Sequence, residues 1–326
     1  MYDARSLKAR IHATTDRVEC PVRGCKHEVP RARKRFQRLP QLRCPAHPIF
    51  ISPSTFEYED YRDNLLIRDD DDRRLLEDIV SVKRETKRLG RERSEDAFTF
   101  NVVRTFQRES LLEDLVSEIS RKDEHAPVPS YWSFSQRDHA QHPLIAKAAV
   151  AFREVEGRGS EPDLIIETRD TLFMVEAKLG STNKTMPSRP SVLKFYKEAE
   201  SGWYSHVIRA EPEELAIKLQ LYQLMRLWLL GTWMARDAHK RLVLVSLVPE
   251  SCDADLVDRF GPHIIQGDAQ TFRRFSWEQV RDITLCFPER RAVAALVAYL
   301  DNKTLGYDAR GQLRLALARP ASSPWC

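Results

Sequence analysis

The segment SEPDLIIETRDTLFMVEAKLGS, residues 160–181, constrains the fold of this chain more than any other. It contains two short apolar runs, Leu164–Ile166 and Leu172–Val175, with polar residues between them. Runs of this length that are bounded by turn-forming residues are typical of buried strands. If Arg169 and Asp170 form the centre of the turn, antiparallel partners have residue numbers that sum to 339. The segment therefore predicts a β-hairpin.

The predicted register gathers charged side chains at the open end of this hairpin. Asp163 faces Glu176, and Glu161 faces Lys178. Glu176 and Lys178 point the same way because they are two residues apart on one strand. Opposed Cβ atoms lie about 4.5–5.5 Å apart, so two carboxylates can share one cation. Carboxylate oxygens suit Mg²⁺ or Mn²⁺, and a lysine beside such a metal suits phosphodiester hydrolysis.

These residues resemble the motif of the PD-(D/E)xK nuclease superfamily, at Pro162-Asp163 and Glu176-Ala177-Lys178. The resemblance implies an α/β, restriction-endonuclease-like fold with an α-β-β-β-α-β core. It implies that Asp163 and Glu176 bind the metal and that Lys178 lies at the attacking water. It also implies a carboxylate on the preceding helix, for which Glu95 is the candidate.

Several alternatives stay open at this point. The motif is short, and the same residues can form a surface salt-bridge ladder on an ordinary hairpin. Asp96 can be confused with Glu95, which can also be an ordinary acid in the first turn of a helix. Some members of the superfamily carry a further polar residue on the helix after the motif. The candidates for that role, whose participation is undecided, are Gln220, Tyr222 and Gln223.

The positive charge of the chain is concentrated near its N-terminus. The net charge is +4, but residues 1–50 hold 12 Lys and Arg against 4 Asp and Glu, a net +8, so the other 276 residues sum to −4. A concentrated basic segment attracts a phosphate backbone. The segment has no long apolar periodicity, so it needs a further stabilising element to fold.

A group of cysteines and histidines within this basic segment can provide that element. The ligand candidates are Cys20, Cys25, Cys44 and His47, in the pattern C-x4-C-x18-C-x2-H. Two close pairs of this kind are typical of tetrahedral zinc sites. His27 is an alternative fourth ligand. We therefore expect a structural Zn²⁺ that supplies folding energy to a small module.

Composition divides the chain into three regions. We expect a basic zinc-binding module at 1–50, a connecting segment with a helix at 51–93, and the PD-(D/E)xK nuclease domain at 94–326. Within the last region, the pattern predicts a helix that begins after Ser94, an apolar helix over about 213–235, a buried strand over 241–248 and a helix near 289–301. The run Asp69–Asp72 fits a solvated helix N-terminus.

Three segments together resemble a group of uncharacterised bacterial restriction-endonuclease-like proteins with an N-terminal zinc module: CPAHPIFISPSTFEYEDYRDNLL, SEDAFTFNVV and SEPDLIIETRDTLFMVEAKLGSTNKT. The expected function is therefore a Mg²⁺-dependent DNA endonuclease, with a role in restriction or defence against foreign DNA implied by the resemblance alone. The alternative is a zinc-containing DNA-binding protein whose nuclease-like core is inactive. RNA and a homodimer stay open as partners.

The sequence points to a cytoplasmic protein. Its N-terminus has no apolar signal region, and the most apolar stretch, Leu215–Met234, contains charged and polar residues that a bilayer core would penalise. No membrane partner is expected. The cleavage specificity, the choice between endo- and exonuclease action and any partner methylase are not encoded in these patterns.

Overall fold

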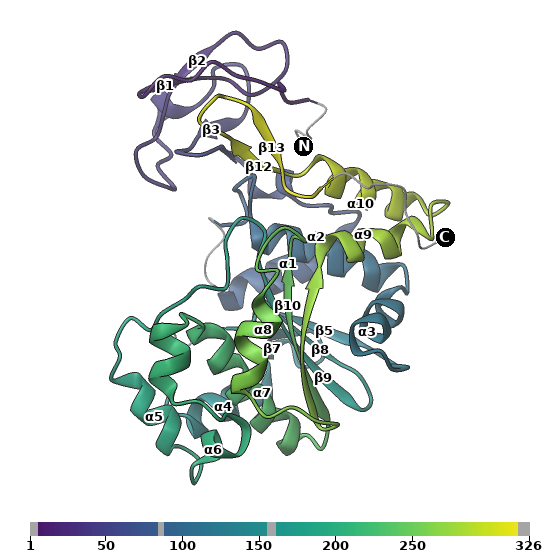
Figure 1. The fold of residues 1–326 in the computed structure, drawn as a ribbon. Helices are drawn as coiled ribbons and strands as arrows, with labels where there is room; N and C mark the ends of the chain where they lie inside the picture. The colour runs from purple at the N-terminus through teal and green to yellow at the C-terminus, as the bar shows by residue number, and fades with distance from the viewer. Residues whose placement is uncertain (1–5, 84–87, 155–160, 319–326) are drawn as a thin grey trace. The chain divides into compact units, whose positions relative to one another are not determined.

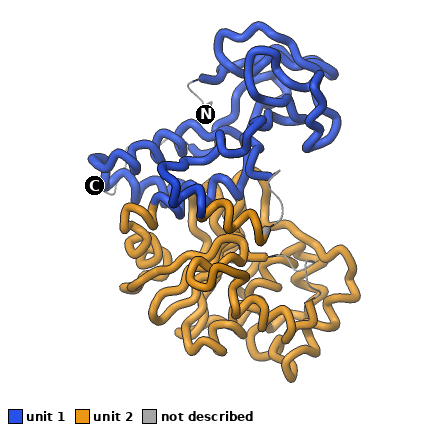
Figure 2. The backbone as a smooth tube through the Cα atoms, turned by 180° about the vertical axis from the view of Figure 1, so that it is seen from behind, with its two compact units in different colours: residues 1–74, 84–105, 278–326 blue, residues 75–83, 106–277 orange. Residues whose placement is uncertain are grey.

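The computed structural model describes residues 6–83, 88–154 and 161–318. The chain divides into two compact units (Figure 2). The first unit comprises residues 1–74, 84–105 and 278–326, and the second comprises residues 75–83 and 106–277. Both α-helices and strands are present, so the expectation of an α/β protein is confirmed.

The second unit is built on a seven-stranded mixed sheet with the order β11-β10-β9-β8-β5-β6-β7 (Figure 1). Neighbours from β9 to β7 are antiparallel, whereas β9, β10 and β11 are parallel to one another. The strands are β5 (Val128–Tyr131), β6 (Phe134–Ser135), β7 (Ala140–Gln141), β8 (Leu164–Glu167), β9 (Thr171–Ala177), β10 (Arg241–Val248) and β11 (Gln270–Ser276).

The hairpin β8–β9 has the register that the sequence predicts. Leu164 pairs with Val175 and Ile165 pairs with Met174, so partner numbers sum to 339. The turn is closed by Thr168, whose backbone N–H donates to the carbonyl of Thr171 at 2.9 Å. Every residue of β9 is buried. The prediction of a buried hairpin is therefore confirmed.

The apolar face of this sheet is covered by helices. The helices of the second unit are α3 (Leu112–Ser120), α4 (Pro143–Ala151), α5 (Val192–Glu198), α6 (Trp203–Val207), α7 (Tyr222–Asp237) and α8 (Leu256–Phe260). Helix α7 packs closest to the sheet, at Gly231. A Cβ added there would lie 2.6 Å from Met174 Sδ and 2.9 Å from Leu242 Cδ1, so this glycine sets the distance between helix and sheet.

The predicted apolar helix over 213–235 is wrong as one continuous element. The chain forms a π-helical turn at Glu214–Lys218 and then breaks at Gln220, which has a φ of 57°. Helix α7 begins only at Tyr222. The apolar periodicity runs through both parts because both pack against the same core, so the pattern does not reveal the break.

The first unit contains short two-stranded sheets and helices. Its strands are β1 (Arg17–Glu19), β2 (Glu28–Pro30), β3 (Ile49–Ile51), β4 (Phe56–Tyr58), β12 (Thr304–Tyr307) and β13 (Leu313–Leu315). Most residues of α2 (Glu95–Arg108), α9 (Trp277–Leu285) and α10 (Arg291–Asn302) belong to this unit, whereas α1 (Asp70–Lys83) is divided, with residues 75–83 in the second unit. Ser94 caps α2 by accepting the backbone N–H of Ala97 at 3.1 Å, as the sequence suggests.

This unit joins the two ends of the described chain. The N–H of Leu313 donates to the carbonyl of Ala9 at 2.9 Å, and that of Ile11 donates to Gly311 at 2.8 Å. Tyr307 and Leu313 pack on the core of the N-terminal segment. Residues 278–326 therefore belong with the N-terminal segment, and the expected boundary at residue 50 falls within β3. Composition alone does not reveal either feature, because both depend on pairing between distant segments.

An ion-pair group fixes the turn end of the hairpin in the second unit. Glu167 accepts from His142 Nε2 at 2.9 Å and from Lys240 Nζ at 3.0 Å. His142 first and Lys240 second lower the pKa of Glu167 from 4.5 to about 2, although burial opposes the shift. Because the folded-state pKa is depressed, this stabilisation is complete above pH 4.5 and is lost as the pH falls towards 2.

We therefore expect Glu167→Gln to lower the free energy of unfolding at pH 7 by about 3 kcal/mol, since each pKa unit corresponds to about 1.4 kcal/mol. Between pH 5 and pH 2, the free energy of unfolding of the variant should also fall less than that of the wild-type protein. Urea denaturation at several pH values measures both effects. Glu198→Gln, at an exposed glutamate on α5, is the control. Equal losses of unfolding free energy in the two variants would contradict the stabilising role of the ion pairs at Glu167.

None of the described helices is long and apolar enough to cross a membrane.

Candidate functional site

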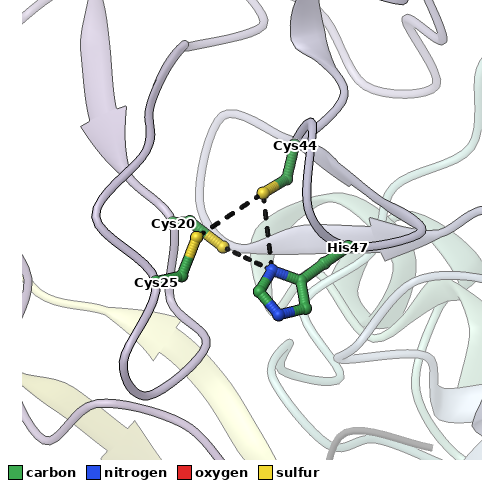
Figure 3. Close-up of side chains that lie close together, drawn as sticks. All are labelled: Cys20, Cys25, Cys44 and His47. Carbon is green, nitrogen blue, oxygen red and sulfur yellow. Dashed lines mark hydrogen bonds between the residues drawn. The ribbon is translucent and has the colours of Figure 1, made fainter.

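A Cys3His group lies in the N-terminal segment (Figure 3). Its ligand atoms all lie within 4.8 Å of one another. The Sγ atoms of Cys25 and Cys44 are 3.8 Å apart, and Nδ1 of His47 lies 3.6 Å from Cys20 Sγ and 3.5 Å from Cys44 Sγ. The three cysteines are buried and His47 is half-buried. The four residues predicted from the sequence are therefore brought together.

The chemistry of this group suits a structural metal. Burial raises the pKa of the Cys20 thiol, and Cys44 adds to this effect. Burial also lowers the pKa of His47, with a contribution from His27, which favours the neutral imidazole that binds metals. A cation would compensate for the cost of buried thiolates. The group could therefore bind a structural zinc. The alternative ligand His27 is exposed and does not belong to the group.

The open end of the β8–β9 hairpin brings together three of the predicted catalytic residues. Asp163 Oδ2 accepts the backbone N–H of Ala177 at 2.8 Å, which fixes the carboxylate beside the end of β9. Glu176 is fully buried, and its Oε1 forms an ion pair with Lys178 Nζ. A buried carboxylate is costly unless it is paired, so Lys178 is held at Glu176 by electrostatics as well as by strand geometry.

The helix after the motif contributes one further residue. Gln223 Nε2 donates to Glu176 Oε2 at 2.7 Å, and its own backbone N–H donates to Thr185 Oγ1 at 2.9 Å. Tyr222 instead directs its hydroxyl to Tyr196, at 3.2 Å. Gln220 lies in the break before α7, with its amide 3.8 Å from Met186 Sδ. Of the three residues left open by the sequence, only Gln223 is bonded to Glu176.

A polar network next to Glu176 was not predicted from the sequence. Ser246 on β10 is the ladder partner of Glu176, and its Oγ accepts from Asn183 Nδ2 at 2.9 Å. Asn183 also donates to Asp253 Oδ2 through its backbone and its side chain, at 2.8 and 2.9 Å. This network ties the loop after β9 to the end of β10. The signal that could have revealed it is Ser246, the one polar residue in the apolar run LVLVSLV, residues 242–248.

The structure describes the local surroundings of two other predicted residues, Glu161 and Glu95. Glu161 is exposed, and among the described residues the β8–β9 ladder ends at the Leu164–Val175 pair. Lys178 instead continues the pairing with β10, because its backbone N–H donates to Leu247 at 2.8 Å. Glu95 is half-buried in the first turn of α2 and belongs to the first unit, as does Asp96. The role of Glu95 as a metal ligand stays a prediction.

Comparison with protein-family models, with curated proteins and with solved structures found no match for this chain.

Proposed function

We propose that this protein is a metal-dependent nuclease that hydrolyses phosphodiester bonds of DNA. The observation that carries the proposal is the group of Asp163, Glu176 and Lys178 at one end of a buried hairpin. A fully buried glutamate in contact with a lysine, at the C-terminal end of the interior strand β9, is energetically costly, and a catalytic role can explain why it is present.

The order of the elements supports the same proposal. Helix α2 precedes strands β5, β8 and β9, and α7 then leads to β10. When α3, β6, β7 and α4 to α6, which lie between them, are left aside, these elements follow the α-β-β-β-α-β order that the resemblance to the PD-(D/E)xK superfamily implies. In the sheet, β5, β8 and β9 are antiparallel neighbours, and β10 lies parallel to β9.

The donor set fits a hard divalent cation. Asp163 and Glu176 would hold Mg²⁺ or Mn²⁺. Such a cation would polarise the scissile phosphodiester and lower the pKa of a water molecule. Gln223 fixes one oxygen of Glu176, and so sets the direction of its carboxylate. Asn183 and Ser246 support the strand ends from behind.

Lys178 has a separate task in this proposal. Its Nζ is held by Glu176, and its backbone carbonyl accepts from Trp277 Nε1 at 2.8 Å, so the start of its side chain is fixed. An ammonium at this point can donate to a phosphate oxygen as negative charge builds in the transition state. It cannot bind a cation itself. Lys178 therefore acts on the phosphate and the water.

The test is cleavage of supercoiled plasmid DNA by the purified full chain. We expect nicked or linear DNA with Mg²⁺ or Mn²⁺ and intact plasmid without a divalent cation. Omission of the cation is a better control than a chelator, because a chelator also competes for a metal at Cys44 and its partners. Failure to cleave duplex DNA, single-stranded DNA or RNA with either cation would contradict the proposal. Binding without cleavage would then favour a DNA-binding protein with an inactive core.

A further inference from the structure

Part of the positive charge of the N-terminal segment is paired within the first unit. Several of its basic residues form ion pairs with acidic residues: Lys8 with Glu19, Arg17 with Glu28, Arg38 with Glu57, and Arg43 with Glu59. Lys8 and Arg17 pair with acids of the segment itself, whereas Arg38 and Arg43 pair with acids beyond residue 50, so only the last two pairs offset its net +8. Within the loop between the two pairs of metal-ligand candidates, Arg33, Lys34 and Arg35 are exposed.

The loop that carries these residues has a defined shape. Gln37 Oε1 accepts the backbone N–H groups of Arg33 and Lys34, both at 3.2 Å. Phe36 has a φ of 61°, and its backbone N–H donates to Glu57 Oε1 at 3.1 Å. These bonds fold the loop back on itself. The Arg35 side chain in this loop is exposed.

A second basic segment lies against this loop. Residues 90–92 run beside β4, since Tyr58 N–H donates to Gly90 at 2.7 Å and Glu92 N–H donates to Phe56 at 3.1 Å. The Arg91 guanidinium lies 5.4 Å from the ring centroid of Phe36, in a cation–π contact. The loop and the segment that leads to α2 therefore bring their arginines to the same place.

The β12–β13 hairpin borders this segment. Thr304 Oγ1 donates to Glu92 Oε1 at 2.9 Å, which fixes β12 beside residues 90–92. Arg314 on β13 is exposed and pairs with Gly306 on β12. Gly306 has a φ of 107°, and a Cβ added there would lie 2.2 Å from the Ser54 carbonyl, so only glycine permits this approach.

Four arginines thus form what we call the arginine cluster: Arg35, Arg91, Arg93 and Arg314. Burial lowers the pKa of Arg93, followed by the charge of Arg35, and Arg314 contributes in the same direction. Burial also lowers the pKa of Arg91, followed by Arg93 and Arg35. Glu95 opposes both effects without cancelling them. Over residues 6–83, 88–154 and 161–318, no member of the cluster forms an ion pair with a carboxylate.

We propose that the arginine cluster binds phosphate groups of a DNA backbone. Four cations from three separate segments repel one another, and an anion placed between them removes that repulsion. Guanidinium groups suit phosphate because they donate two parallel hydrogen bonds to its oxygens. The cluster adjoins the loop between the two pairs of metal-ligand candidates, so a metal there would stabilise the shape of the surface. The inference rests on the proposed DNA substrate but concerns binding alone.

The test measures the affinity of the full chain for a fluorescent 20-base-pair duplex, by anisotropy with Ca²⁺ in place of Mg²⁺, at several salt concentrations. The variant Arg35→Gln/Arg314→Gln removes two exposed members of the cluster. The control Arg10→Gln/Arg23→Gln removes the same charge from exposed arginines of the same unit outside the cluster. We expect the cluster variant to bind more weakly by a factor of roughly 100, about tenfold for each lost charged contact. Its slope of log K against log salt should fall by about 1.8.

The outcomes separate this inference from the proposed function. Equal affinities and slopes for the cluster and control variants would overturn the inference, even if the wild-type protein cleaves DNA. A loss of DNA affinity in the cluster variant but not in the control variant would support the inference, even if the wild-type protein does not cleave DNA. Tighter binding of an RNA hairpin with the same dependence on the cluster would overturn the assignment to DNA. The variants should have the same melting temperature as the wild-type protein, because the substituted arginines are exposed.

Discussion

Asp163→Asn should reduce DNA cleavage by at least about 10³-fold and should leave the fold intact. Asparagine keeps an oxygen that can accept the Ala177 N–H, so the contact that fixes this side chain survives. It loses the negative charge, and a neutral amide is a poor ligand for Mg²⁺ at a two-carboxylate site. Removing a group that stabilises charge in the transition state lowers the reaction rate by a factor of this order. Initial rates on plasmid DNA measure the effect.

The control for this variant lies on the same hairpin. Asp170→Asn removes an equal charge from an exposed turn residue at the opposite end, and we expect wild-type cleavage. Lys178→Ala should also lose cleavage, but it should keep its affinity for Mn²⁺, because an ammonium is not a ligand. Full activity in Asp163→Asn would refute the site. A loss of metal affinity in Lys178→Ala as severe as in Asp163→Asn would refute the division of roles.

Cys44→Ser should abolish tight metal binding and unfold much of the first unit. The Sγ of Cys44 contacts both Cys25 and His47, so its loss disrupts the whole group. Structural zinc contributes about 10–16 kcal/mol of apparent binding free energy in small modules, more than most domains have in reserve. Because Tyr307 and Leu313 pack on the same core, the disturbance should spread to β12 and β13.

Two measurements check this result. Elemental analysis should find about one zinc per chain in the wild-type protein and none in Cys44→Ser. Hydrogen exchange should show lost protection in β1–β4 and β12–β13, while the sheet of the second unit stays protected. Cys286→Ser, at an exposed cysteine on the chain that follows α9, is the control. An unchanged metal content and exchange pattern in Cys44→Ser would show that the group is coincidental.

The features that could be predicted from the sequence are those set by local patterns. The β8–β9 register follows from two apolar runs and a short turn, so Asp163 and Glu176 could be assigned to one end of the hairpin. The Cys3His group follows from its spacing, because each close pair of ligands lies on one turn. Ser94 could be assigned as the helix cap because its hydroxyl acts within its own first turn.

The features that could not be predicted depend on contacts between distant residues. Nothing near Gln223 distinguishes it from Gln220, since the choice depends on the break before α7. Arg314 has no local signal that relates it to Arg35, because β12 and β13 bring them together. The division by composition failed to group residues 278–326 with the N-terminal segment for the same reason.

The pairing of Leu313 with Ala9 also has a consequence for synthesis of the protein. During translation the N-terminal segment leaves the ribosome first, yet its partner strands β12 and β13 follow some 300 residues later. The intervening second unit has its own core and can fold in the meantime. Closing so long a loop is slow, and until then the apolar side chains that meet Tyr307 and Leu313 stay uncovered. Early capture of a metal by the cysteine pairs would protect the nascent segment from aggregation during this interval.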